Sequence, residues 1–425
     1  MTTIEIPRRP SSFRWISRTW RECYVFSPVL VAVLLVHGGF FFRAGSPFEQ
    51  HFLAFSGLRE AYIGLCCFAA ILAVIEGLHR KRFGAGDLIL LLVVLAFAFG
   101  SATFAYLKFG QPVFYGLFEE RRVLLFFGMF LILAAYFQFS NRPEALVGAI
   151  YWAALIYLCL GLVMQTGLLG DLASRDIPDL DPRKYRILVG SDMYSISIVI
   201  GSVMIIRHGA WEHLVPVLVG VAGLLLISQT RSTIGIVIVA VGVIFALTSW
   251  RHFLVAAAGG VVGLVALFLW TKVSGGDLGV GNSVAELDVR VTTSRTILTE
   301  LEKNDWLGMG ALSLQWQNGF HRIYDKHFYL SDVGVVGEFY RFGIFLFVIY
   351  GGLAIAIFSY FRQPMDPRGR SIANGLFILF IINAFGAGLF AFVGPYLAIL
   401  LALTVAFRKH EYAPRTLGSR LRLRL

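Results

Sequence analysis

The chain has 425 residues, of which 57% are hydrophobic and 15% charged, and its formal net charge is +11. Soluble domains carry about 25% charged residues, so the composition excludes a soluble protein held by a single anchor. It indicates an all-α polytopic membrane protein. The four cysteines lie in or beside apolar runs, and their spacing fits neither a disulfide framework nor a zinc site.

Apolar segments long enough to cross a bilayer recur along the chain, because each crossing needs about 20 residues. The segment at 190–206 is short and carries an acid, so we expect it to start irregularly. The last two segments must be separated by a turn at Gly394-Pro395, since proline cannot continue a helix. The sequence predicts about 12 transmembrane helices, at 25–42, 61–78, 88–106, 123–139, 146–168, 190–206, 214–229, 233–250, 253–271, 341–361, 371–391 and 393–408.

Lysine and arginine are concentrated in alternate connecting segments, which predicts that both termini are cytoplasmic. The net positive charge therefore reflects orientation and no nucleic-acid binding, and the basic tail is expected to be solvated near anionic lipid. This orientation predicts a cytoplasmic N-terminal segment at 1–22 and nine spans with short loops at 23–271. It then predicts one large extracytoplasmic loop with short helices at 272–340, three spans at 341–408 and a basic cytoplasmic tail at 409–425.

One arginine stands between two apolar runs in "LLLISQTRSTIGIVIVAV". Arg231 falls in a very short outer link, and no Asp or Glu lies within ten residues of it. A guanidinium near a bilayer is costly and keeps its charge. It either extends towards the lipid headgroups or binds a partner.

The predicted outer segments gather further cations and two histidines. Fixed guanidinium groups at a membrane surface match phosphate or pyrophosphate oxygens, and a nearby histidine can take a proton from an alcohol near neutral pH. The large outer loop at 272–340 has no Asp-x-Asp pair or His/Cys cluster suited to a metal, and no phosphate-binding Gly-rich Lys motif occurs in the chain. The residues concerned are Arg186, Arg231, Arg295, Arg322, Arg341, His321 and His327.

Four stretches together resemble a known family. They are "RILVGSDMYSISI", "LLLISQTRSTIGIVIVAV", "SRTILTELEKNDWLGMGAL", which predicts an amphipathic helix ending in a glycine turn, and "HFYLSDVGVVGEFYRFGI". In order, spacing and predicted outer location they resemble the O-antigen ligase and polymerase superfamily of bacterial polysaccharide assembly. With the predicted spans, the resemblance covers about residues 60–405.

The resemblance implies a glycosyltransferase of the bacterial inner membrane with a periplasmic active site. Its donor would be a glycan linked to undecaprenyl pyrophosphate, its acceptor a glycan or lipid core, and it would need no metal or other cofactor. Arg231 and Arg295 would hold the pyrophosphate, with Arg186 and Arg322 as further candidates, and a loop histidine would activate the acceptor hydroxyl. Membrane lipids, a chain-length regulator and a flippase are further candidate partners.

The chain departs from the family pattern at the base. The family histidine is commonly followed by Asn, but Phe328 follows His327, and His321 is a rival base. Asp332 and Glu338 are candidate acidic helpers. Each has a plainer interpretation, because a loop histidine can simply be solvated and Asp332 can cap a helix.

Two other polar groups have structural interpretations. The run "GLFEERRVLLFF" favours an interfacial ion-pair cluster over a site, and His37 in "LLVHGGFF" is expected to pack at a helix end. Three functions remain open: a polysaccharide polymerase, an O-antigen ligase that moves the finished glycan, and a polysaccharide or lipid transporter. A transporter predicts charged or broken helices near the bilayer midplane, whereas these charges lie at the predicted outer edge.

Overall fold

The structure, a computed structural model, describes most of the predicted helical core. It covers residues 26–39, 57–79, 84–140, 142–166, 190–229, 231–249, 280–313, 333–388 and 394–408, with isolated residues at 251, 254, 316, 317 and 319. Within these ranges the side chains of 57–59, 231, 280–290, 387 and 394–395 lie outside the description. The described residues form helices and no β-strand, which confirms an all-α protein.

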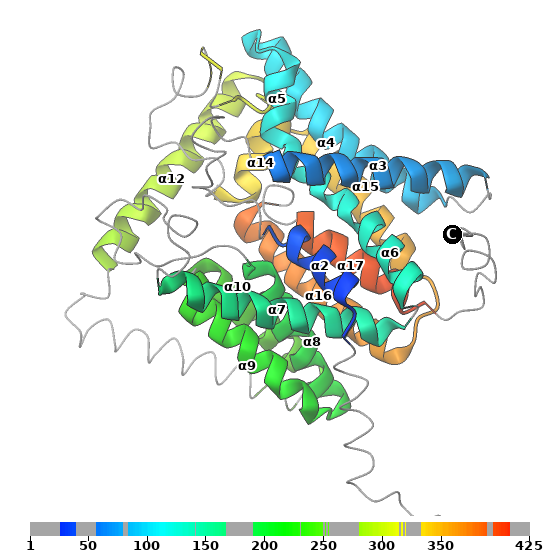
Figure 1. The fold of residues 1–425 in the computed structure, drawn as a ribbon. Coiled ribbons are helices and arrows are strands. Elements are labelled where there is room, and N and C mark those ends of the chain that lie inside the picture. Colours follow the sequence, from blue (N-terminus) through cyan, green and yellow to red (C-terminus); the bar gives the residue numbers. More distant parts are fainter. Residues whose placement is uncertain are drawn as a thin grey trace, which may run out of the picture.

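Most helices run back and forth through one bundle (Figure 1). By length and apolar composition, six segments among the described residues can cross a membrane, and four shorter apolar helices accompany them. These helices are consistent with an all-α membrane protein, whereas the count of 12 spans and the sides of the membrane remain predictions. The six are Glu60–His79, Ala85–Phe109, Val113–Phe139, Pro143–Gln165, Trp211–Ser228 and Pro367–Gly386.

The helices of the first half follow the apolar segments closely. Pro residues start α2 and α7, where the missing N–H is harmless. The bounds are α2 Pro28–His37, α3 Gly57–His79, α4 Ala85–Phe109, α5 Val113–Glu120, η1 Arg121–Phe127, α6 Gly128–Phe139, α7 Pro143–Gln165 and α8 Ser191–His208.

The second half contains two helices that do not cross the bundle, α12 and the short α14. Its elements are η3 Trp211–His213, α9 Leu214–Ala222, η4 Gly223–Ser228, α10 Arg231–Ala246, α12 Val280–Lys303, α14 Val335–Phe342, α15 Phe345–Phe361, α16 Pro367–Ala387 and α17 Gly394–Ala406. A break before the last span is confirmed, since α16 ends at Ala387 and α17 begins at Gly394. The turn predicted at Gly394-Pro395 is misplaced, because these two residues open α17. The predicted span at 253–271 lies almost entirely outside the described residues.

Three boundaries differ from the sequence expectation. Residues 107–122, between two predicted spans, were expected to form a loop. Instead α4 continues to Phe109, and α5 and η1 are helical and continuous with α6. The charges of this stretch lower its hydropathy, yet ion pairs with other helices neutralise part of them. The segment at 190–206 does not start irregularly, because α8 is helical from Ser191. The span predicted at 341–361 is broken at Gly343, whose φ of +54° ends α14 before α15 begins.

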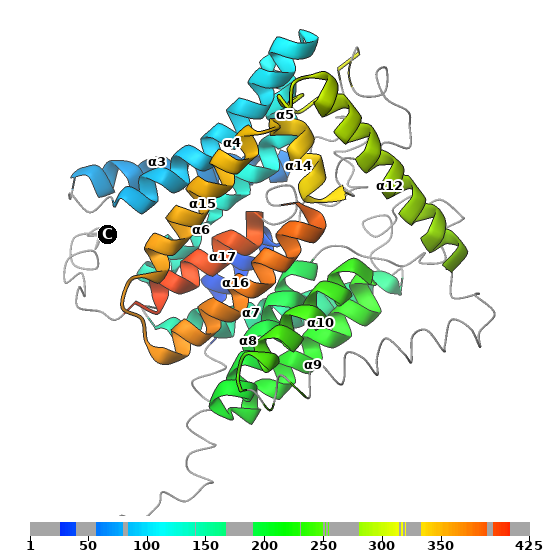
Figure 2. The same ribbon diagram turned by 180° about the vertical axis from the view of Figure 1, so that it is seen from behind.

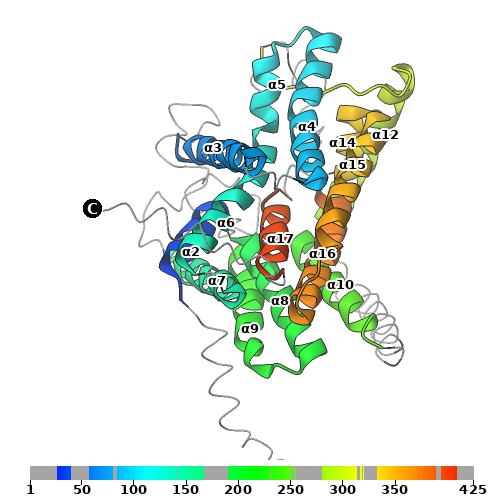
Figure 3. The ribbon, with the colours of Figure 1, turned by 90° about the vertical axis from the view of Figure 1, so that its right-hand side faces the viewer.

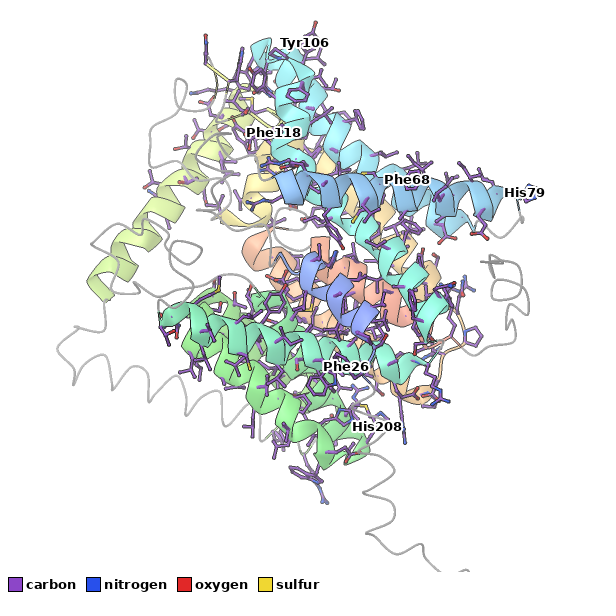
Figure 4. All side chains as sticks on the ribbon, in the orientation of Figure 1. Phe26, Phe68, His79, Tyr106, Phe118 and His208 are labelled. Carbon is purple, nitrogen blue, oxygen red and sulfur yellow. The ribbon has the colours of Figure 1, made fainter. Side chains whose placement is uncertain are left out.

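Helix α8 forms the centre of one half of the bundle. Every residue from Met193 to Met204 is buried, and the helix packs against α7, α9, α10 and α16. By contrast, α3 packs mainly on α6 and η1 and projects sideways from the bundle (Figure 3). Large apolar side chains such as Phe68 are exposed on α3, and Figure 4 shows Phe68 pointing away from the other helices. Exposure of this kind suits contact with lipid.

One end of the bundle carries α14 and α12, and we call it the α14 end. Helix α12 crosses beside this end and touches α14, while the bundle helices run towards it (Figures 1 and 2). The buried Ile297 and Leu301 of α12 pack with Met309 and Tyr340 in a small separate core. The predicted amphipathic helix followed by a glycine turn is thereby confirmed. Tyr106, near the end of α4, and His208, at the end of α8, mark opposite ends of the bundle (Figure 4).

Candidate functional site

The corner before Arg231 is tight. The preceding helix finishes in a π-helical turn, η4, and Gln229 adopts a left-handed conformation with φ of +49°. Helix α10 begins two residues later, at Arg231. The sequence prediction of a very short link between two helices is therefore confirmed.

Arg231 occupies a position that does not favour a cation. The N-terminus of a helix carries a partial positive charge, and the first turn of α10 has no acidic residue. Free backbone N–H groups and a guanidinium at one point attract an anion. The side chain of Arg231 lies outside the described residues, so its partner stays a prediction.

The corner lies at the α14 end of the bundle. A Cβ atom on Gly386, near the end of α16, would meet Ile236 in the first half of α10, and one on Gly334, beside α14, would meet the backbone of Phe385. The end of α16 thus joins the start of α10 to the start of α14. An anion bound at Arg231 would sit on the same end of the bundle as α14.

A strap of residues, Asn304–Ser313, connects α12 to the bundle. Its backbone N–H groups at Met309 and Gly310 donate to the carbonyls of Tyr340 and Arg341 at 2.8 and 2.9 Å, and that of Ala311 donates to Ser101 at 3.1 Å. Gly308 and Gly310 are required here, because a Cβ on either would lie closer than 2.5 Å to backbone atoms of α14 or α4. The strap therefore fixes the end of α12.

Side chains of the predicted ion-pair cluster hold the strap and α14. Glu120 is 3% exposed, and its Oε1 lies 3.2 Å from the Arg341 guanidinium and accepts from Ser101 at 3.0 Å. Glu119 accepts a hydrogen bond of 2.8 Å from the hydroxyl of Ser313. The interpretation as a structural cluster is thereby supported, and Arg341 is occupied by Glu120 instead of being available to a phosphate.

The neighbouring ion pair joins a different set of helices. Arg121 donates to Glu60 on α3 at 2.9 Å and lies 3.8 Å above the ring of Phe118. It ties α3 to η1. The expectation for His37 is also confirmed, since it is 1% exposed and hydrogen-bonds with Tyr62 at 3.0 Å.

Arg295 and Glu338 are not brought together. Arg295 is exposed and lies two residues from the buried Thr293 and Ile297, on the opposite face of α12. It is accessible to a ligand but faces away from α14. Glu338 is 2% exposed and accepts a hydrogen bond of 2.5 Å from Tyr350, so the structure places it inside the bundle against α15.

The remaining predicted site residues lie outside the described residues. They are Arg186, His321, Arg322, His327 and Asp332. Their roles, and the convergence of Arg231 with Arg295, stay predictions. In the described part of the chain, no three His, Cys, Asp or Glu side chains are grouped as metal ligands would be.

A polar group that the sequence reasoning did not assign to the site lies near the corner. Asp192, in the first turn of α8, hydrogen-bonds with Tyr396 of α17, which also hydrogen-bonds with Asn383 of α16 and Ser195. These helix ends all belong to the α14 end. The available signal was one acid at the start of an otherwise apolar span, and only the fold supplies its partners.

Comparison with known proteins adds no relative. No protein-family model matches this chain, and a search of curated proteins found no match.

Proposed function

We propose that this protein is an integral-membrane glycosyltransferase that polymerises or transfers oligosaccharide units linked to undecaprenyl pyrophosphate. The observation that carries the proposal is Arg231, which begins α10 directly after a tight corner at the α14 end of the bundle. The resemblance to the O-antigen ligase and polymerase superfamily supports the same conclusion.

The chemistry follows from the activated donor. A hydroxyl of the acceptor attacks the anomeric carbon of the donor sugar, the new glycosidic bond forms, and the bond to the pyrophosphate breaks. The leaving group takes the electron pair, and fixed guanidinium groups stabilise its growing charge. Arg231 is the first candidate for this role, with Arg295, Arg186 and Arg322 in support. His327, or else His321, accepts the proton of the hydroxyl.

The first experiment tests Arg231 directly. Arg231→Lys keeps the charge but loses the bidentate fork, so glycan transfer by purified protein should fall sharply for both Arg231→Lys and Arg231→Ala. Arg362→Ala is the control, because Arg362 also stands at a helix end but next to Phe358 at the opposite end of the bundle. If Arg231→Ala keeps full activity, Arg231 does not bind the donor, and contact with lipid headgroups is the interpretation that is left.

Polymerase and ligase differ in the acceptor and not in the donor site. The absence of a His-Asn pair favours a polymerase. Glycan chain length in a deletion strain distinguishes them. Loss of long chains, with single units still attached to the surface anchor, indicates a polymerase, whereas long chains left on the lipid carrier indicate a ligase.

A further inference from the structure

Two polar side chains contact one carboxylate at the α14 end of the bundle, and two more contact the tyrosine that binds it. Tyr396 donates a hydrogen bond to Asp192, and the Ser191 hydroxyl lies 3.5 Å from its Oδ1. Asn383 and Ser195 hydrogen-bond in turn with Tyr396. The three supporting residues Tyr396, Asn383 and Ser195 are 5%, 7% and 0% exposed, whereas Asp192 itself is partly exposed.

This arrangement fixes a single acidic group. Polar and ionisable side chains within a membrane bundle are costly, and they commonly mark a functional position. Residues behind a contact group hold it in its working orientation when their own hydrogen bonds are satisfied. Tyr396 has that role here, because it is buried between α16 and α8 and its hydroxyl reaches the partly exposed acid.

The position of Asp192 relates it to the proposed donor site. It stands in the first turn of α8, which packs against both η4 and α10 on either side of the Arg231 corner. A carboxylate repels a pyrophosphate, so Asp192 does not bind that part of the donor. The sugar attached to the pyrophosphate carries hydroxyl groups, and a hydroxyl donates a strong hydrogen bond to a carboxylate.

We propose that Asp192 binds a hydroxyl group of the sugar attached to the lipid pyrophosphate, and that Tyr396 positions it for that contact. An ionised carboxylate has about four acceptor positions, and Tyr396 and Ser191 use two of them. The inference rests on the proposed function for the identity of the lipid. It adds a residue that recognises the glycan to residues that recognise the pyrophosphate.

Binding of two lipid probes separates these roles. The purified full-length protein is mixed with undecaprenyl pyrophosphate alone, or with the same lipid carrying glucose, galactose or N-acetylglucosamine, and bound lipid is measured by native mass spectrometry. Wild type should bind at least one sugar-bearing lipid more tightly than the bare lipid. A hydrogen bond to a charged group corresponds to roughly a 10- to 100-fold difference in affinity, and Asp192→Asn should remove most of it without lowering the affinity for the bare lipid.

A matched control exists at the opposite end of the bundle. Asp87, in the first turn of α4, also accepts a hydrogen bond from a tyrosine, Tyr360 of α15. Asp87→Asn makes the same chemical change far from the proposed site, so it should leave both affinities unchanged. Tyr396→Phe provides a second variant if Asp192→Asn is poorly folded, and it should weaken binding of the sugar-bearing lipid by a smaller factor.

The possible failures are distinguishable. If Asp192→Asn keeps the preference for the sugar-bearing lipid, or if wild type has no such preference, the carboxylate does not contact the sugar, although the pyrophosphate site stands. If Asp192→Asn only lowers the melting temperature with binding intact, the network serves helix packing and the inference is wrong. If wild type binds none of the lipids, the proposed function fails, and this inference fails with it.

Discussion

Removing the charge of Glu120 should lower the stability of the protein, because this side chain holds the α14 end of the bundle together. Glu120→Gln keeps the shape of the side chain and an oxygen that can accept from Ser101, but it leaves the Arg341 guanidinium without its counter-ion. Glu120 is 3% exposed, and one guanidinium nitrogen of Arg341 lies 3.2 and 3.3 Å from its two carboxylate oxygens. The loss therefore affects a buried pair and not a surface one.

The magnitude follows from burial. Breaking a buried ion pair by removing one partner costs about 3–5 kcal/mol. The Arg341 side chain is 16% exposed, so water can recover part of that loss, and we expect a value near the lower limit, about 3 kcal/mol. For a chain of 425 residues such a loss lowers the melting temperature by about 3 °C.

Thermal unfolding of detergent-purified variants, followed by fluorescence-detected gel filtration, measures this loss. Glu60→Gln is the matched control, because it removes the counter-ion of Arg121 in the adjacent pair, which joins α3 to η1. A double variant, Glu120→Gln with Arg341→Met, should recover part of the loss, because neither charge then remains buried alone. A single variant as stable as wild type, or a double variant less stable than the single one, would refute the reasoning.

Further predictions concern the strap, the topology and the base. Gly343→Ala should lower the melting temperature more than Gly351→Ala, because Gly343 has φ of +54° and a Cβ there would lie 2.0 Å from a backbone oxygen, whereas Gly351 has open space around it; equal melting temperatures would contradict this. Cysteine at Ser283 should react with an impermeant thiol reagent in outer-membrane-permeabilised cells; protection there would reverse the orientation. His327→Ala should reduce turnover by about 10²–10⁴-fold with donor binding little changed, and His321→Ala should reduce it less; the opposite order would make His321 the base. Purified enzyme should retain activity in EDTA, and loss of activity that added divalent ions restore would end the metal-independent mechanism.

Hydropathy alone was enough to predict most helices, because an apolar run near 20 residues long has few alternatives in a membrane. Hydropathy failed to predict helices in segments that contain several charged residues. The charges at 119–122 predict a loop. The segment is helical, because Glu120 and Arg121 form ion pairs with residues of α14 and α3. Those partners, Arg341 and Glu60, lie 221 and 61 residues away in the chain, and no local pattern can identify such pairings.

In the candidate site, too, features set by neighbouring residues could be predicted, whereas contacts between residues far apart in the sequence could not. The Arg231 corner could be predicted, because the six polar residues at 228–233, between two apolar runs, are enough for a short link and little else. The carboxylate of Asp192 could not be assigned to that corner, because its partner Tyr396 lies on α17, about 200 residues further along the chain, and Tyr396 is held by Asn383 of α16. A helix that starts with an acid can use it as an ordinary first-turn residue. What distinguishes Asp192 is that Tyr396 reaches it from another helix and is itself held by Asn383. That arrangement exists only after the bundle has formed, so the structure, rather than the sequence, provides the reason to test Asp192.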